Sequence, residues 1–243
     1  MTRCSVAMAV YNGEKYLPAQ LDSILSQLGE DDELIISYDR SSDGTLGLIR
    51  GYEARDRRVK VTENPSSGIT GNFENALRHC SGRYIFISDQ DDVWCDGKID
   101  LVLRCFEETG ADFVIHNGVH TDGDLRPVTK SFFEIYPIVG RGKLKNIISA
   151  RVSGCTTAFT SRMRDIIVPI PRIQDYDHWN LCIAQHAGRI AYLDRELILH
   201  RLHGGNATKP DGERRPLGEI IRSRAGLIKA LYSRMRMLKK GEI

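Results

Sequence analysis

Strand-like and helix-like segments alternate along the first half of this chain, and this alternation limits its fold more than any other feature. Runs rich in β-branched and aromatic residues predict strands over 5–10, 33–39, 59–63, 84–88 and 111–116. Between them, apolar residues recur every three or four positions, which predicts helices over 16–28, 44–54, 72–80 and 98–108. Alternating strands and helices form a largely parallel sheet with helices on both faces, so we expect an α/β fold.

The alternation fails after residue 117. Residues 118–142 carry Gly, Pro, Asp and aromatic residues without a clear period, and we expect a long functional loop or subdomain there. Helical patterns return over 143–150 and 176–187, and short strands are predicted near 155–159, 189–192 and 197–202. Residues 204–213 have the composition of a linker, and Pro216 can open a last helix.

Composition excludes several classes of protein. Of the 243 residues, 41% are hydrophobic and 27% are charged, as in ordinary soluble globular proteins. No run approaches the roughly 20 apolar residues of a membrane span, and no signal peptide precedes the first strand. The six cysteines form no C-x-x-C pair, so we expect buried thiols rather than disulfides or zinc ligands. These features predict a cytoplasmic protein, and a net charge of +2 gives no reason to expect a nucleic-acid partner.

An acidic segment follows the strand-like run that ends at residue 87. Residues 88–92 are Ser-Asp-Gln-Asp-Asp, so the carboxylates of Asp89, Asp91 and Asp92 lie where open α/β sheets bind ligands. Burying such like charges costs several kcal/mol each unless a cation or hydrogen bonds compensate. Mg²⁺ or Mn²⁺ with a diphosphate would compensate them. A solvated acidic turn is the alternative, although such a turn does not explain the apolar strand and Trp94 on either side of it.

Other loops at strand ends could contact the same ligand. Tyr11, beside the Asn12-Gly13 turn, could pack on a ligand ring, and an ordinary turn is the alternative. Asp39 is a candidate acceptor for a nucleobase N–H, whereas Asp43 could simply cap the next helix. No G-x-G-x-x-G follows the first strand and no G-x-x-x-x-G-K-[ST] occurs, so a dehydrogenase or a P-loop NTPase is not expected.

Taken together and in this order, the motifs resemble the family 2 glycosyltransferases of GT-A fold. They are residues 10–13 (VYNG), 38–45 (YDRSSDGT), 72–73 (NF) and 88–94 (SDQDDVW), followed by 154–156 (GCT), 176–179 (YDHW) and 201–206 (RLHGGN). The form of residues 89–94 is similar to the branch that contains bacterial rhamnosyltransferases. The resemblance covers about residues 3–206 and implies one GT-A domain with a nucleotide-binding half (1–117) and an acceptor half (118–206).

The resemblance also implies roles for matching residues. Nucleotide-sugar binding falls to Tyr11, Asn12, Asp39, Asn72, Asp89, Gly154 and Cys155, metal binding to Asp91, Asp92 and His203, and general-base catalysis to Asp177. On the residues alone, Asp177 could be a first-turn acid of a helix and His203 a loop histidine bonded to backbone. The family usually has Asp and Gly where this chain has Tyr38 and Arg40, which bears on the nucleobase preference and on activity.

The resemblance implies an inverting transfer, dependent on Mg²⁺ or Mn²⁺, from a nucleotide diphosphate sugar to a hydroxyl of a glycan or lipid-linked acceptor. The branch suggests dTDP-rhamnose as donor and surface polysaccharide synthesis as context. A sugar-phosphate nucleotidyltransferase is one alternative, but the chain lacks a Gly-rich basic loop after the first strand. A catalytically silent nucleotide-sugar-binding module is another, and Tyr38 and Arg40 motivate it.

The last part of the chain, residues 207–243, is expected to be a linker and a basic amphipathic helix. Residues 214–240 hold nine Lys or Arg against one acid, Glu219, with apolar residues at intervals of three or four. Such a helix can lie on anionic lipid at the inner face of the cell membrane. Packing on the domain or on a second subunit is the alternative.

Overall fold

The computed structural model describes residues 2–140, 142–172, 175–204 and 217–243. The strands are β1 (Cys4–Val10), β2 (Glu33–Tyr38), β3 (Val59–Glu63), β4 (Tyr84–Ser88), β5 (Val93–Trp94), β6 (Phe113–Thr121), β7 (Pro127–Ser131), β8 (Thr157–Thr160) and β9 (Ile190–Arg201). The helices are α1 (Leu17–Leu25), α2 (Thr45–Arg55), α3 (Ile69–His79), α4 (Lys98–Thr109), α5 (Phe132–Ile135), α6 (Lys143–Ile148), α7 (Ser161–Ile167), α8 (Tyr176–Ala187) and α9 (Leu217–Lys240), with a 3₁₀ turn η1 (Gly154–Thr156). The predictions for Asn206 and Pro216, and for most of the linker, lie outside the described residues.

All the described strands join one sheet, in the order β3-β2-β1-β4-β8-β6-β9-β5, with β7 paired to β6. The pairs β3–β2, β2–β1 and β1–β4 are parallel, as the alternation of strands and helices predicts. Beyond β4 the sheet is mixed, because β8 runs antiparallel to both β4 and β6, whereas β9 is parallel to β6. The α/β prediction is confirmed, and its parallel part is the first half of the chain.

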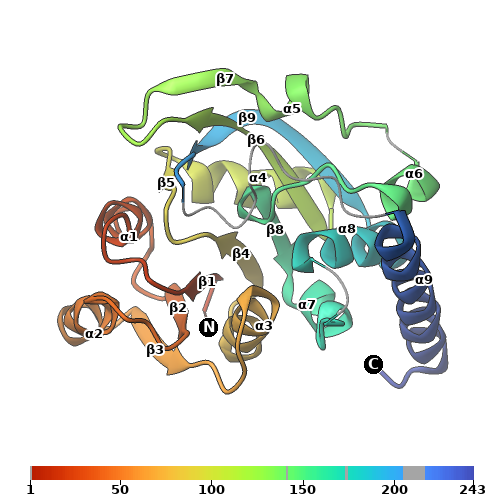
Figure 1. Cartoon of the computed structure of the whole chain (residues 1–243), viewed down its shortest axis with the longest axis horizontal. Helices are drawn as coiled ribbons and strands as arrows, with labels where there is room; N and C mark the ends of the chain where they lie inside the picture. Colours follow the sequence, from red (N-terminus) through yellow and green to blue (C-terminus); the bar gives the residue numbers. More distant parts are fainter. Residues whose placement is uncertain (1, 141, 173–174, 205–216) are drawn as a thin grey trace.

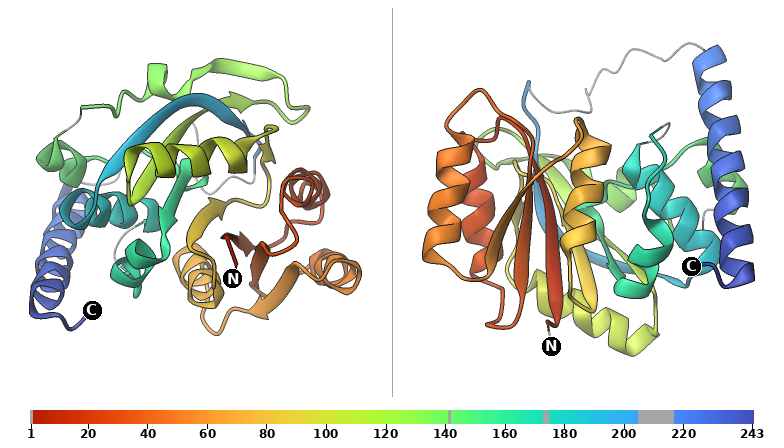
Figure 2. Two further views of the ribbon diagram at one scale, coloured as in Figure 1. Left: turned by 180° about the vertical axis from the view of Figure 1, so that it is seen from behind. Right: turned by 90° about the horizontal axis from the view of Figure 1, so that it is seen from below.

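Helices cover both faces of the sheet (Figure 1 and Figure 2). One core contains residues of α1, α2 and α4, and the other contains residues of α3, α7, α8 and α9. The strands between them are buried on both faces and alternate between the two cores. In β4, for example, Phe86 belongs to the first core, while Ile85 and Ile87 belong to the second. Burial on both faces explains why these strands are continuous apolar runs.

The second half contains more regular structure than its sequence pattern predicts. In place of the loop expected over 118–142, β6 continues to Thr121 and forms a hairpin with β7. α5 follows, and it begins with a capping box formed by Ser131 and Glu134. The two short strands predicted over 189–192 and 197–202 are one strand, β9, whose pairing with β6 is interrupted by register shifts. The predictions of two short strands and of a loop were wrong because β9 and the end of β6 pair with each other from distant parts of the chain, and local periodicity does not report such pairing.

The C-terminal helix α9 packs on the domain. Leu227 and Leu231 are buried in the second core, against α8 and α6. Arg234 is also buried, and its guanidinium donates to the carbonyls of Val168 (3.0 Å) and Pro169 (2.7 Å). One face of α9 therefore packs on the domain, which is one of the alternatives predicted for this helix. Among the described residues, no helix has both the length and the apolar character that crossing a bilayer requires.

Candidate active site

A cavity of about 1450 Å³ lies where β1, β2 and β4 end and where α3 and α8 begin. This is the edge of an open α/β sheet at which ligands bind. Seven of the residues predicted to form the site line this cavity: Tyr11, Asp39, Asn72, Asp89, Asp91, Gly154 and Asp177. The other four, Asn12, Asp92, Cys155 and His203, are not among its lining residues.

Asp39 and Asn72 form the end of the cavity at β1 and β2. The Asp39 carboxylate accepts from the Asn64 side chain (2.8 Å) and from the Gly68 amide (3.1 Å), so it is held in one orientation. Asn72 is buried and donates its Nδ2 to the Val10 carbonyl (3.1 Å), while its Oδ1 has no partner among the described residues. A buried amide oxygen without a partner costs about 1–3 kcal/mol, so it favours a ligand that donates to it.

The loops around this end are tied to one another. The Gln90 side chain accepts from the Tyr11 amide and donates to the Tyr11 carbonyl, both at 2.8 Å. The Asn12 side chain accepts from the Ser42 amide (2.8 Å), so it joins two loops and does not line the cavity. The Tyr38 hydroxyl accepts from the Ser41 amide (2.9 Å), which gives this departure from the family a structural role. Sequence analysis missed the role of Gln90. The available signal was its side-chain amide, which can both donate to and accept from one peptide group.

The acidic loop after β4 brings carboxyl groups into the cavity, where burial opposes their ionisation. Burial, with the nearby charges of Asp92 and Asp91, raises the pKa of Asp89 to about 8. Burial and the charge of Asp92 also raise the pKa of Asp91, although its Oδ2 pairs with His203 Nε2 at 2.8 Å. The His203 ring also packs on Tyr16, with ring centroids 4.6 Å apart. His203 therefore lies between Asp91 and the Tyr16 ring.

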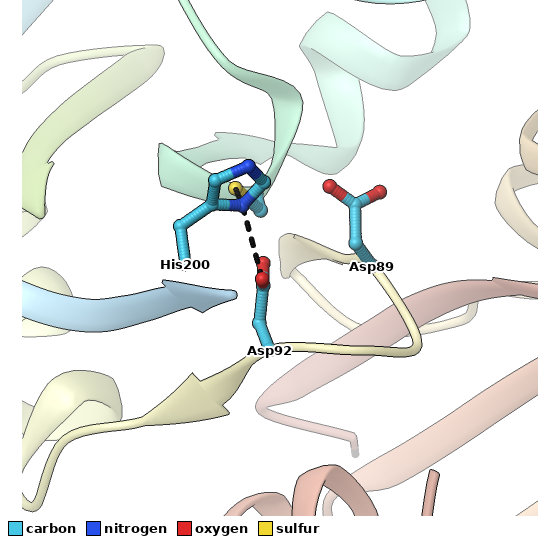
Figure 3. A group of neighbouring side chains, drawn as sticks. Asp89, Asp92 and His200 are labelled. Carbon is cyan, nitrogen blue, oxygen red and sulfur yellow. Dashed lines mark hydrogen bonds and ion pairs between the residues drawn. The ribbon is translucent and has the colours of Figure 1, made fainter. Parts of the chain in front are cut away.

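Asp92 and His200 form a buried ion pair (Figure 3). Asp92 Oδ1 lies 3.0 Å from His200 Nδ1 and accepts from the Arg201 amide at 3.1 Å. Burial alone would raise the pKa of Asp92, but the charge and hydrogen bond of His200 hold it below its usual value. Burial likewise opposes protonation of His200, and Asp92 nevertheless raises its pKa well above the usual value. This pair fixes the end of β9 beside the acidic loop.

Two sets of side chains could hold a metal ion. Ligand atoms of Asp89, Asp92, Cys155 and His200 lie within 4.8 Å of one another. Burial raises the pKa of Cys155 to about 12, so its sulfur is a neutral thiol, and sulfur suits soft metals rather than Mg²⁺ or Mn²⁺. Asp89 and Asp91 offer hard oxygen ligands and line the cavity. Burial and the neighbouring carboxylates raise their pKa values, and a bound cation would favour their ionised forms. The second set, with His203 beside Asp91, fits the predicted divalent ion better.

Lys98 stabilises the turn η1 through its ammonium group. The residue is fully buried, and its Nζ donates to the Cys155 carbonyl (3.1 Å) and lies 4.0 Å from the centre of the Trp94 ring. Burial lowers its pKa to about 8. Gly154 is required at the start of this turn, because an added Cβ would lie 2.0 Å from the Tyr176 hydroxyl. Nothing in the sequence pattern distinguished Lys98 from a surface lysine at the start of a helix.

Asp177 lies in the first turn of α8 and lines the cavity. Its Oδ1 accepts from the His178 amide at 2.6 Å. Burial, and then the charge of Asp175, raise the pKa of Asp177 to about 7. Asp177 is therefore a first-turn acid, as one alternative held, and it also faces the cavity with the proton affinity that suits a general base near neutral pH.

Comparison with known proteins agrees with this architecture. Residues 5–168 match the profile described as glycosyl transferase family 2. The chain is 29% identical over 181 residues to a putative teichuronic acid biosynthesis glycosyltransferase, TuaG, of Bacillus subtilis, covering 72% of this chain and 69% of TuaG. It is 32% identical over 114 residues to the Escherichia coli UDP-Glc:alpha-D-GlcNAc-diphosphoundecaprenol beta-1,3-glucosyltransferase WfgD, covering 46% of this chain and 44% of WfgD. The chain thus spans between about half and two thirds of the length of these relatives.

Solved structures share the fold at low identity. Residues 1–349 of TarS from S. aureus in complex with UDP-GlcNAc align with a TM-score of 0.73 at 20% identity, covering 93% of this chain and 66% of that one. The mannosyltransferase PcManGT from Pyrobaculum calidifontis in complex with GDP-Man and Mn²⁺ aligns with a TM-score of 0.65 at 16% identity, covering 99% and 79%. The profile match extends over more than half of the sequence, from β1 to the end of α7. This chain belongs to glycosyl transferase family 2.

Proposed function

We propose that this protein transfers a sugar, with inversion, from a nucleotide diphosphate sugar to a hydroxyl of a glycan or lipid-linked acceptor. The observation that carries the proposal is the arrangement of carboxylates in one cavity. Asp89 and Asp91 follow β4, and Asp177 lines the same cavity from α8 with its pKa raised to about 7. Carboxylates that bind a cation and a separate carboxylate that accepts a proton are the two functions this reaction needs.

Binding of the donor would use the end of the cavity near β1. Asp39 is fixed by two hydrogen bonds and can accept from a nucleobase N–H, and the exposed ring of Tyr11 can pack on the base. The Oδ1 of Asn72, which no described residue bonds, can accept from a donor group of the nucleotide. Asp89, which also lines the cavity, would contact the ribose. Gly154, which lines the cavity and admits the Tyr176 ring, would lie beside the sugar, and Cys155 would act through its carbonyl bond to Lys98.

A divalent cation, Mg²⁺ or Mn²⁺, would be held by Asp91 with His203 and Asp89. When bound, such an ion neutralises the charge that develops on the diphosphate leaving group. Asp92, also predicted as a ligand, is paired with His200 and with the Arg201 amide. We therefore propose that Asp92 positions the β9 segment that leads to His203, rather than binding the ion directly.

Asp177 would act as the general base. Its ionised carboxylate accepts the proton of the acceptor hydroxyl as that oxygen bonds to the anomeric carbon. The bond between the anomeric carbon and the diphosphate oxygen breaks on the opposite face, which inverts the configuration. The nucleoside diphosphate leaves with the bonding electrons.

The donor sugar and the cellular context are also proposals. The names of the relatives and structures above mention UDP-Glc, UDP-GlcNAc and GDP-Man, so UDP-sugars come before dTDP-rhamnose as candidate donors. WfgD is named for a lipid-linked acceptor and TuaG for teichuronic acid synthesis, which supports a role in surface polysaccharide assembly. A protein that works on such an acceptor would be cytoplasmic and attached to the membrane surface, and the basic helix α9 could provide that attachment.

Slow hydrolysis of the donor without an acceptor tests the reaction. Purified protein with Mn²⁺ is incubated with UDP-glucose, UDP-N-acetylglucosamine and dTDP-rhamnose in turn, and nucleoside diphosphate and free sugar are measured. We expect one donor to release both products. Sugar phosphate would instead indicate a nucleotidyltransferase, and binding without any product would indicate the silent module that Tyr38 and Arg40 suggest. Asp177→Asn is the matched control, which should bind the donor and lose turnover.

A further inference from the structure

The cavity extends beyond the acidic loop into a region that the roles above do not use. Its walls come from β6, α5 and the segment after α5, and they are formed by His116, His120, Phe132, Phe133, Tyr136 and Ile138. We call these six residues the aromatic lobe. Phe132 and Ile138 are buried, whereas Tyr136 is partly exposed at the rim. Apolar walls with a few polar groups are typical of a site for a small organic ligand.

His116 carries a hydrogen-bond acceptor without a partner in this lobe. Its side chain is fully buried, and Nδ1 lies 2.7 Å from the Asn117 carbonyl. Because a carbonyl only accepts, Nδ1 holds the proton, and the neutral ring then presents a lone pair at Nε2. Nε2 is buried and has no partner among the described residues. An O–H or N–H of a ligand is the group that would satisfy it.

His120 adds a second polar group among aromatic rings. Its ring centroid lies 4.5 Å from that of Phe132 and 6.2 Å from that of Tyr136, and the Tyr136 ring is perpendicular to it. Its Nδ1 is buried and also lacks a partner among the described residues. An alkyl chain would fill this lobe but would leave both imidazole nitrogens unpaired, at a cost of about 1–3 kcal/mol for each.

We propose that the aromatic lobe is a subsite for a neutral pyranose ring. A pyranose presents an apolar C–H face that packs on aromatic rings, and a rim of hydroxyls that hydrogen bond to groups such as His116 Nε2 and His120 Nδ1. This assignment rests on the proposed glycosyl transfer, because both the acceptor and the donor supply such a ring. It adds His116, His120, Phe132 and Tyr136 to the residues that select the sugar.

The test measures binding of methyl pyranosides (glucoside, galactoside, rhamnoside and N-acetylglucosaminide) by saturation-transfer NMR, with and without UDP and Mn²⁺. Tyr136→Ala should weaken binding of the preferred pyranoside about tenfold, and Tyr232→Ala, a matched change on the exposed face of α9, should not. His116→Leu should lose binding, and His116→Gln should retain part of it because its amide oxygen also accepts. A pyranoside that lacks the hydroxyl bonded to His116 should bind poorly to the wild type.

A second measurement distinguishes the two sources of the ring. If the lobe holds the acceptor sugar, Tyr136→Ala changes pyranoside binding and leaves the affinities for UDP and UDP-glucose unchanged. If it holds the donor sugar, the variant lowers the affinity for UDP-glucose relative to UDP. The proposal is overturned if Tyr136→Ala, folded and with normal UDP affinity, changes neither. Failure of the wild type to bind UDP would contradict the proposed function instead, and pyranoside binding without UDP would still report on the lobe.

Discussion

Asp177 is the residue whose environment makes the sharpest prediction. Burial and the charge of Asp175 raise the pKa of Asp177 to about 7. Because only the ionised carboxylate can act as the base, the rate of transfer should increase with pH, with a midpoint near pH 7. Asp175→Asn removes a like charge and should move the midpoint to lower pH. Asp177→Asn should reduce turnover by about 10²–10⁴ with donor affinity unchanged. Steady-state rates from pH 5 to 9 test this, and a flat profile for the wild type would exclude Asp177 as the base.

The neighbouring carboxylates Asp91 and Asp92 should respond differently to the same substitution. Asp91→Asn removes a hard oxygen ligand, so calorimetric binding of UDP should lose its dependence on Mn²⁺ and its sensitivity to EDTA. Asp92→Asn breaks the buried pair with His200, and breaking such pairs costs about 3–5 kcal/mol of folding stability. Its melting temperature should fall, whereas Mn²⁺-dependent UDP binding below that temperature should persist. Loss of the Mn²⁺ dependence in both variants would assign both carboxylates to the metal.

At the scale of elements, α9 has two different faces. One packs through Leu227 and Leu231 on the domain, and the other exposes Ile221, Ile228 and Tyr232, which are 52–71% exposed, beside basic residues. Basic residues near an anionic surface contribute about 1 kcal/mol each. We predict that the protein sediments with anionic liposomes, that high salt releases it, and that Ile228→Glu weakens the binding. Val128→Glu, a matched change at an exposed position of β7, is the control, and equal binding to neutral and anionic vesicles would contradict the prediction.

Elements also show where sequence patterns predict structure and where they do not. The strands β1 to β4 are apolar runs between amphipathic helices, and short parallel crossovers make their pairing predictable. β6 pairs with β8 and β9, which lie far along the chain, and nothing local in residues 118–142 indicates those partners. The same limit applies to the site. Asp91 and Asp177 lie in recognisable sequence motifs. The pKa values of His116, His120 and Lys98 are lowered by burial, which only the folded structure shows.

At the scale of the whole molecule, the cavity is built from both halves of the sheet. β1, β2 and α3 supply the end at which we propose that the nucleotide binds, and β6, α5 and α8 supply other parts of the wall. A ligand that contacts both halves stabilises the folded chain as a unit, because unfolding of either half removes part of the site.

UDP with Mn²⁺ should therefore raise the melting temperature of the whole protein. At about 100 times its Kd, one ligand adds about 2.7 kcal/mol, and a chain of this size gains roughly 2–4 °C for each kcal/mol. A shift of roughly 5–10 °C is expected in differential scanning fluorimetry, with UDP alone giving less because no cation then offsets the charge of the diphosphate beside the acidic loop. In Asp91→Asn the added effect of Mn²⁺ should disappear. Equal shifts for UDP with Mn²⁺ and UDP with EDTA, in the wild type, would show that the acidic loop binds the nucleotide without a cation.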